Sequence, residues 1–309
     1  MTAARVQAPA KLNPWLAVLG RRADGFHDVD LGMLALELSD VVEARATDQP
    51  GVQLELSGPA LSADVPADER NLAWRAAEAV LELAPAGLAG PAGPGRRGVH
   101  LRLEKHVPSR AGLGGGSSDA AAACVATALA LGFEPARADL LARLADLGSD
   151  CPFFLAAEDT GYARCRGRGE QVQALPAAAD GWHIALLTPD VQVPTGPVFA
   201  QVSEPSRPVG GPVSFDLPAE GLRAALFNDL EGPAELEVPA LAAWRSLLDA
   251  VRPGFRMSGS GSSFFCCFRE REAADRCLDE AVTAAARCGL SLRGAWVTRP
   301  IGHGVRRIG

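Results

Sequence analysis

The sequence predicts a protein of two domains that combines α-helices and β-strands. Its 309 residues are enough for two domains with sizeable cores, and 48% of them are hydrophobic. The segment Val99–Lys105 alternates like a strand. It leads through a glycine-rich loop into the alanine-rich run Ala120–Leu131, which favours a helix. Strand, loop and helix therefore form one coherent unit.

Further elements follow from local patterns, taken in chain order. The run around Val18–Leu19 is apolar and strand-like, and Gln53–Leu56 alternates like a strand. Leucines at helical spacing predict a helix over Leu140–Leu147, which Gly148 ends. Phe264–Phe268 is uniformly apolar and predicts a buried strand.

Composition excludes several classes of protein. The net charge of −7 argues against nucleic acid as the main partner. The seven cysteines show no C-x-x-C spacing and predict reduced thiols. The N-terminal residues lack the apolar stretch of a signal peptide, and no apolar run reaches the roughly 18 residues that span a bilayer. We expect a cytoplasmic protein without a membrane partner.

The glycine-rich loop is the most informative segment of the chain. Ser117 and Ser118 are good N-cap residues for the helix that follows, and a helix N-terminus behind a glycine loop favours an anion such as phosphate. The alternative is a flexible linker. The segment fits neither the Walker A pattern nor the dinucleotide-binding G-x-G-x-x-G pattern. Glycine can adopt positive φ angles and lets the backbone approach a ligand closely. The glycines of this loop are Gly112, Gly114, Gly115 and Gly116.

Lysine usage marks two further positions. Of the 30 basic residues only Lys11 and Lys105 are lysines, and the compact ammonium group is not equivalent to guanidinium at a tight site. An ordinary surface role is the alternative, above all for Lys105. Lys11 and Asn13 alternate with apolar neighbours and so face one side, which predicts a polar pocket. His27 follows a turn and is either a ligand contact or a solvated loop residue.

Two more segments carry candidate residues. Asp150 precedes a proline and an apolar run, so its carboxylate is either a base that orients a hydroxyl or a surface turn residue. The segment Met257–Ser262 is built from small residues and allows a tight turn, with or without a ligand.

Together these motifs resemble the GHMP kinase family. The opening motif of the family resembles Ala8–Asn13 followed by Gly20–His27, its ATP loop resembles Pro108–Ala121, and its third motif resembles Met257–Ser262. Segments around Asn71 and Asp150 also match, in order and over almost the whole chain. The Lys-x-Asn start with Gly-Arg-Arg-x-Asp-Gly-x-His resembles the branch that acts on 4-diphosphocytidyl-2-C-methyl-D-erythritol.

The resemblance implies an activity and roles for single residues. ATP, with Mg²⁺, phosphorylates the 2-hydroxyl of that cytidine diphospho-methylerythritol in the non-mevalonate route to isoprenoid precursors. Asp150 orients or accepts the proton of the hydroxyl, and Lys11 pairs with Asp150. The implied substrate-binding residues are Asn13, Phe26, His27, Phe199, Gly259 and Gly261, with the cytosine held between aromatic rings. The implied ATP-binding residues are Asn71, Lys105, Pro108, Ala111, Gly112, Leu113, Gly114, Gly115, Gly116, Ser117 and Ser118.

The resemblance also implies an α+β fold with the active site in the cleft between two domains. Residues 1–160 would form the ATP-binding domain and residues 161–309 the substrate domain.

The chain departs from the family pattern at two positions. Relatives commonly carry Tyr where this chain has Phe26, and Asn where it has Asp119. Ser118 is a candidate for holding the metal, whose ligands stay unassigned. The chain is expected to be a monomer or a homodimer.

Two alternatives stay open. Another GHMP kinase, such as a homoserine or mevalonate kinase, would lack a use for the cytidine-side residues Phe26, His27 and Phe199. A non-catalytic nucleotide-binding protein would lack a use for Lys11 and Asp150.

Overall fold

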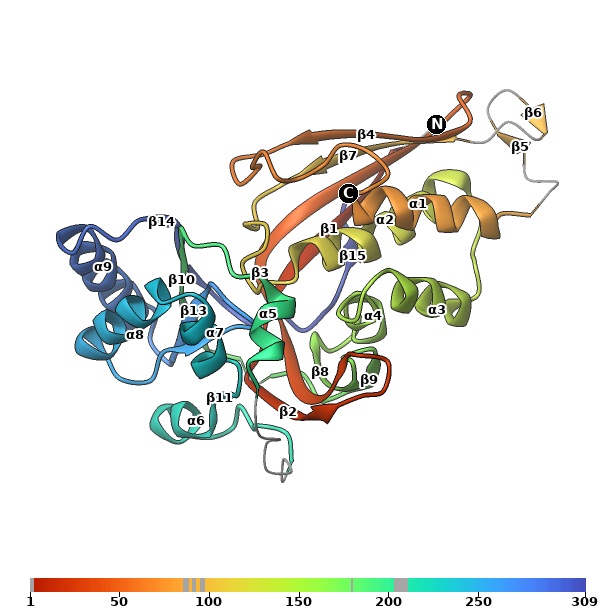
Figure 1. Ribbon diagram of the computed structural model, residues 1–309. Coiled ribbons are helices and arrows are strands. Elements are labelled where there is room, and N and C mark those ends of the chain that lie inside the picture. The colour runs from red at the N-terminus through yellow and green to blue at the C-terminus, as the bar shows by residue number, and fades with distance from the viewer. Residues whose placement is uncertain (1–2, 86–88, 91–92, 95–97, 179, 203–210) are drawn as a thin grey trace.

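The computed structural model describes residues 3–85, 89–90, 93–94, 98–178, 180–202 and 211–309, and it combines a large sheet and a smaller one with helices. Figure 1 shows the two sheets in separate parts of the molecule, with both chain ends beside the larger one. The α+β fold predicted from the sequence is confirmed. Within these ranges, the structure has no helix with the length and apolar content that crossing a membrane requires.

The large sheet is organised around one long strand, β3, which runs from His27 to Thr47. β3 pairs antiparallel with β1, β2, β7 and β8, while β4 pairs parallel with β7. This pairing aligns segments that are distant in the sequence along a single strand. The other strands of this sheet are β1 (Ala4–Leu12), β2 (Trp15–Arg21), β4 (Gly51–Ser57), β7 (Gly98–Glu104), β8 (Tyr162–Gly167), β9 (Gln171–Ala174), β11 (Phe227–Asn228) and β15 (Arg306–Arg307).

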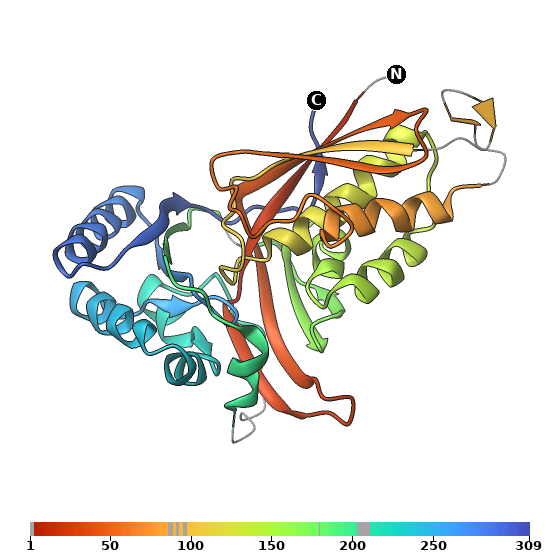
Figure 2. The same ribbon diagram turned by 45° about the horizontal axis from the view of Figure 1, so that its top comes forward.

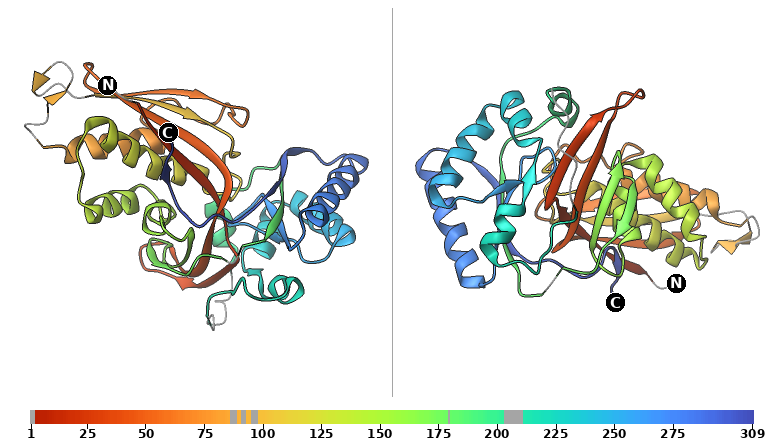
Figure 3. Two further views of the ribbon diagram at one scale, coloured as in Figure 1. Left: turned by 180° about the vertical axis from the view of Figure 1, so that it is seen from behind. Right: turned by 90° about the horizontal axis from the view of Figure 1, so that it is seen from below.

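Four helices gather on one side of this sheet, as the views in Figures 1 and 3 show. They are α1 (Leu72–Leu83), α2 (Gly115–Leu131), α3 (Arg137–Leu147) and α4 (Cys151–Ala156). α2 is buried over most of its length, because its alanines let it pack closely against β1 and β3. The predicted end of α3 at Gly148 is confirmed.

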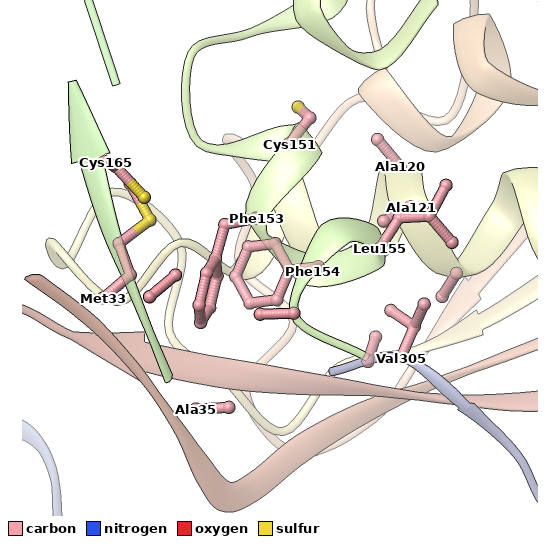
Figure 4. Close-up of a cluster of buried hydrophobic side chains, with 14 of the residues drawn as sticks. Met33, Ala35, Ala120, Ala121, Cys151, Phe153, Phe154, Leu155, Cys165 and Val305 are labelled. Atoms are coloured by element: carbon pink, nitrogen blue, oxygen red, sulfur yellow. The ribbon is translucent and has the colours of Figure 1, made fainter. Parts of the chain in front are cut away.

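The short helix α4 is anchored by two phenylalanines. Phe153 and Phe154 are fully buried and pack edge to face, with ring centroids 5.0 Å apart. Figure 4 shows them between Met33 and Cys165 on one side and Leu155 and the α2 alanines on the other. Burying each ring contributes about 1.5–3 kcal/mol. The anchor matters for the site, because Asp150 immediately precedes α4.

The smaller sheet has the strand order β12-β13-β10-β14. Figure 2 shows α8 and α9 packed beside it. Fully apolar β13 lies at its centre, as its sequence predicts. Its strands are β10 (His183–Pro189), β12 (Arg256–Met257), β13 (Phe264–Phe268) and β14 (Leu292–Thr298), and its helices are α5 (Thr195–Ala200), α6 (Ala219–Ala225), α7 (Glu231–Glu237), α8 (Ala240–Val251) and α9 (Arg271–Arg287). A separate pair, β5 (Ala89–Gly90) and β6 (Gly93–Pro94), lies apart from both sheets.

The later part of the chain contributes strands to the large sheet. The predicted boundary at residue 160 falls just before β8, which still pairs with β3 in the large sheet. At the other end, β15 returns to pair with β1. The chain first passes from the large sheet to the small one between Ala174 and His183, and β11 and β15 later rejoin the large sheet.

Candidate active site

A lysine and a carboxylate meet at the centre of the candidate site. Lys11 lies near the end of β1, and its Nζ lies 3.4 Å from Oδ2 of Asp150. Nζ also donates a 2.8 Å hydrogen bond to Oδ1 of Asn13, whose amide donates to the Gly32 carbonyl. The predicted side-by-side placement of Lys11 and Asn13 is therefore observed, and the two polar groups form one hydrogen-bonded chain.

The absence of side chains on two glycines makes room for Lys11. A Cβ on Gly114 would lie 2.8 Å from Cγ of Lys11, and a Cβ on Gly259 would lie 3.4 Å from its Nζ. Both glycines also have positive φ angles, +67° and +58°. The glycine loop and the third motif thus enclose the lysine from two sides, which explains why both positions need glycine.

The glycine loop packs backbone to backbone against the third motif. A Cβ on Gly112 would lie only 2.1 Å from the carbonyl oxygen of Ser258. The Ser258 hydroxyl donates a 2.9 Å hydrogen bond to the Gly112 carbonyl, and the Ser263 amide donates to the Ala111 carbonyl. The two motifs therefore form one unit.

The start of α2 differs from the prediction. Gly114, in the left-handed conformation, is the N-cap, so Ser117 and Ser118 lie within the first turn rather than capping it. The Ser118 hydroxyl is buried and has no hydrogen-bond partner among the described residues. Glycine takes the cap position because a positive φ angle is needed there. The metal role considered for Ser118 gains no support from this buried position.

Lys105 lies below the loop rather than at its surface. Its Nζ contacts Asp40 and, at 2.6 Å, Oδ2 of Asp119, and its side chain is 3% exposed. Burial lowers the pKa of Lys105, but the two carboxylates outweigh burial and raise it. A second oxygen of Asp40 accepts the backbone amides of His106 and Val107. The amine of Lys105 is thus paired with two buried carboxylates, and it lies close to Gly115 at the start of α2, where a Cβ would be 3.4 Å from Nζ.

Asn71 has a structural partner as well. It is the N-cap of α1, where its side chain accepts the Ala73 amide at 2.9 Å and donates to the Pro66 carbonyl. Its side chain is largely buried. Any contact between Asn71 and a ligand would have to use the donor and acceptor capacity of its side chain that these two hydrogen bonds leave free.

The predicted aromatic residues come together, but in an arrangement that differs from the prediction. The rings of His27 and Phe199 stack directly, with centroids 5.3 Å apart and planes at 29°. In this conformation no room is left between these two rings for a base. Phe26 is 52% exposed, and the guanidinium of Arg168 lies 5.0 Å from its ring centroid. Burial, and the charge of Arg21, lower the pKa of His27 below 6.5.

Many of the predicted residues line one cavity of about 1240 Å³ between the two parts of the chain. Its volume exceeds the roughly 300–1,000 Å³ of ordinary ligand pockets, which suits two ligands better than one. The predicted residues that line it are Lys11, Asn13, Phe26, His27, Gly112, Gly114, Asp150, Phe199, Gly259 and Gly261. The predicted residues outside its lining are Asn71, Lys105, Pro108, Ala111, Leu113, Gly115, Gly116, Ser117 and Ser118.

Sequence reasoning missed several cavity residues that carry polar groups. Arg110 and Arg168 bring positive charge, and Thr195 and Ser260 join their hydroxyls at 2.9 Å across the cavity wall. The arginines belong to loops, where no periodic pattern marks them. With Lys11 and Arg21 they outnumber the carboxylate of Asp150 in the lining, so the cavity favours anionic ligands.

A metal ion would have few protein ligands here. Among the residues that the structure describes, no group of three or more His, Cys, Asp or Glu side chains is placed to hold one. Mg²⁺ is commonly bound through one or two carboxylates together with substrate phosphates. Asp150 is the carboxylate in the cavity lining, so most ligands of such an ion would come from the phosphates and water.

Comparisons with known proteins show which proteins the chain resembles. Residues 71–158 match the family model described as GHMP kinases N terminal domain, and residues 214–287 match the one described as GHMP kinases C terminal. Two curated relatives are named 4-diphosphocytidyl-2-C-methyl-D-erythritol kinase. One, from Rhizorhabdus wittichii, is 39% identical over 88% of each chain. The other, from Synechococcus sp. (strain CC9311), is 34% identical over 98% of this chain and 97% of its own.

Two solved structures resemble this chain in fold. A crystal structure of 4-(cytidine 5'-diphospho)-2C-methyl-D-erythritol kinase is 32% identical and superposes with a TM-score of 0.72, covering 97% of this chain and 100% of the other. Homoserine kinase from Cytophaga hutchinsonii superposes with a TM-score of 0.73 at 18% identity, covering 100% and 98%. At that identity the second match shows the fold alone.

Proposed function

The chain belongs to the GHMP kinase family, and we propose that it transfers a phosphoryl group from ATP to the 2-hydroxyl of 4-diphosphocytidyl-2-C-methyl-D-erythritol. Relatives of that name match it over most of their length and its own. The cavity adds physical support, because it is large, positively lined and bordered by aromatic rings. ATP and a cytidine diphosphate ester are both polyanions, and each carries a base.

The Lys11–Asp150 pair provides the chemistry. The carboxylate of Asp150 orients the acceptor hydroxyl and takes its proton as the oxygen attacks phosphorus. The ammonium of Lys11 stabilises the negative charge on the transferring group and keeps the carboxylate in place. Phosphoryl transfer depends mainly on positioning and electrostatics, which suits a lysine fixed by two glycines and an amide.

The glycine loop is the proposed phosphate-binding element. Gly112 and Gly114 line the cavity in front of α2, whose free N-terminal amides favour an anion. Lys105 pairs with Asp40 of β3 and with Asp119 of α2, and these two ion pairs hold the start of α2 against the large sheet. Mg²⁺ bound to the ATP phosphates would neutralise part of their charge.

The cytosine is proposed to stack on the outer face of His27. Phe199 already covers the other face, so the two rings form a rigid platform with Phe26 beside it. A neutral His27, favoured by its lowered pKa, can both donate and accept a hydrogen bond. Six of the seven free thiols are buried, which fits the reducing cytoplasm that we propose as the place of action.

One observation carries the proposal: the Lys11–Asp150 pair, the glycine loop and the aromatic platform line the same cavity. The test is a coupled assay of ADP release with Mg²⁺-ATP and the cytidyl alcohol, with mevalonate and homoserine in parallel. ADP release with the cytidyl alcohol alone is expected. Turnover of homoserine or mevalonate instead would retain the kinase chemistry and refute the substrate. ATP binding without turnover of any alcohol would favour a non-catalytic nucleotide-binding protein.

A further inference from the structure

The backbone at Arg110 is unusual. Arg110 has a φ angle of 48°, and it is the non-glycine residue with positive φ among the described parts of the chain. Residues other than glycine, asparagine and aspartate rarely adopt this conformation, because their Cβ crowds the backbone. The position lies two residues before Gly112, within the glycine loop. Strain of this kind at a ligand-binding loop points to a functional use of the side chain.

Arg110 borders the cavity, and its side chain is loosely held. It contributes to the same lining as Lys11, Gly112 and Gly114. Its side chain is 66% exposed, and its one ion pair among the described residues joins Nε to Oδ2 of Asp64 at 3.5 Å. An exposed ion pair of this length is weak, so the guanidinium can exchange partners at little cost.

The partner carboxylate does not depend on Arg110. Asp64 accepts hydrogen bonds from the hydroxyls of Ser62 and Ser109, the latter at 2.9 Å. The Ser62 bond contributes most to lowering the pKa of Asp64, against the effect of burial. Asp64 therefore stays hydrogen-bonded when Arg110 moves away, which makes the exchange easier.

We propose that Arg110 binds a phosphate group of the nucleotide, its guanidinium moving from Asp64 to the phosphate oxygens. The planar fork of arginine matches phosphate and binds it through two parallel hydrogen bonds. The glycine loop supplies backbone amides at this site, and Arg110 adds a full positive charge beside them. The inference rests on the proposed function only in that the loop binds ATP.

The experiment compares Arg110→Gly with the wild-type protein. Glycine adopts the positive φ angle freely, so this variant removes the guanidinium and relieves the backbone. Arg110→Gln is the second variant, because it keeps a polar side chain of similar reach. Arg102→Ala is the matched control: Arg102 is 55% exposed and paired with Glu55 at 3.0 Å, on β7 and outside the cavity lining.

Two readouts separate a phosphate contact from a structural role. Calorimetric titration with ATP and with adenosine should show ATP binding weakened about tenfold in both Arg110 variants, with adenosine binding unchanged. In the turnover assay, the KM for ATP should rise in the same proportion while kcat and the KM for the alcohol stay unchanged. The thermal midpoint of Arg110→Gly should be equal to or above that of the wild type, and Arg102→Ala should match the wild type throughout.

Other results would overturn the inference. These are unchanged ATP affinity, an equal loss for ATP and adenosine, or a rise confined to the KM of the cytidyl alcohol. If wild-type protein binds ATP but turns over no alcohol, the proposed function fails, and the calorimetric comparison still decides the role of Arg110.

Discussion

Nζ of Lys11 lies 3.4 Å from Oδ2 of Asp150, but the two side chains differ in their access to solvent. Lys11 is 5% exposed, whereas Asp150 is 30% exposed and faces the cavity. The lysine is thus the fixed partner and the carboxylate is the one that can reach a substrate. This asymmetry agrees with the proposed roles and yields separate predictions for the two residues.

Replacing Asp150 by asparagine should abolish most turnover. The amide keeps the size of the side chain but cannot accept the proton of the hydroxyl, so kcat should fall about 10²- to 10⁴-fold. ATP affinity, measured by calorimetry, should stay unchanged. Asp146→Asn is the control, because Asp146 is exposed near the end of α3 and outside the cavity lining. Turnover close to the wild-type rate in Asp150→Asn would remove this carboxylate from the mechanism.

Lys11→Arg should be inactive although it retains the charge. Gly114 and Gly259 leave room for a narrow side chain with a small head group, and a guanidinium is wider. We expect kcat to fall at least about a hundredfold, the loss typical of removing one well-placed stabilising group. Steady-state kinetics and a thermal unfolding curve are the measurements. A folded variant with near-normal kcat would show that the positive charge alone is sufficient.

Phe199→Ala should weaken binding of the cytidyl alcohol. Without Phe199 behind it, His27 loses its stacked partner and the platform for the base becomes mobile. One base–aromatic stack is worth about 1–3 kcal/mol, so the KM for the alcohol should rise about tenfold. The KM for ATP is the internal control and should not change. Equal effects on both substrates would argue against a role on the cytidine side.

Asp119→Asn should change how stability depends on pH. Burial raises the pKa of Asp119 well above 3.8, even though Lys105 opposes this shift. The folded state therefore holds this proton more tightly than the unfolded state, and that stability is lost as the pH rises from 3.8 through the raised pKa. The asparagine variant lacks this loss. Its stability relative to the wild type should increase from pH 5 to pH 8.

Denaturant unfolding at the two pH values measures the difference. A matched control is Asp139→Asn, because Asp139 is an exposed acid in the first turn of α3. An offset between Asp119→Asn and the wild type that is the same at both pH values would mean that Asp119 does not titrate in this way.

Local patterns in the sequence were sufficient for many elements of this fold. The strand over Phe264–Phe268 and the end of the helix at Leu147 follow from runs of apolar residues and from a glycine, which act within a few residues. Lys11 and Asp150 could be recognised as candidates for the same reason, because each differs in type from its neighbours in the sequence. The α+β class and the kinase family follow from these short segments taken together.

The sequence by itself determined the elements, the family and the candidate catalytic pair, since these depend on neighbours along the chain. Only the tertiary structure decided what the side chains contact. β3 aligns four other strands, and the folding that follows places Asp40 on Lys105, Phe199 on His27 and Arg110 in the cavity wall. Such contacts join distant segments through non-local pairing and packing, and no local pattern encodes which pairs will meet.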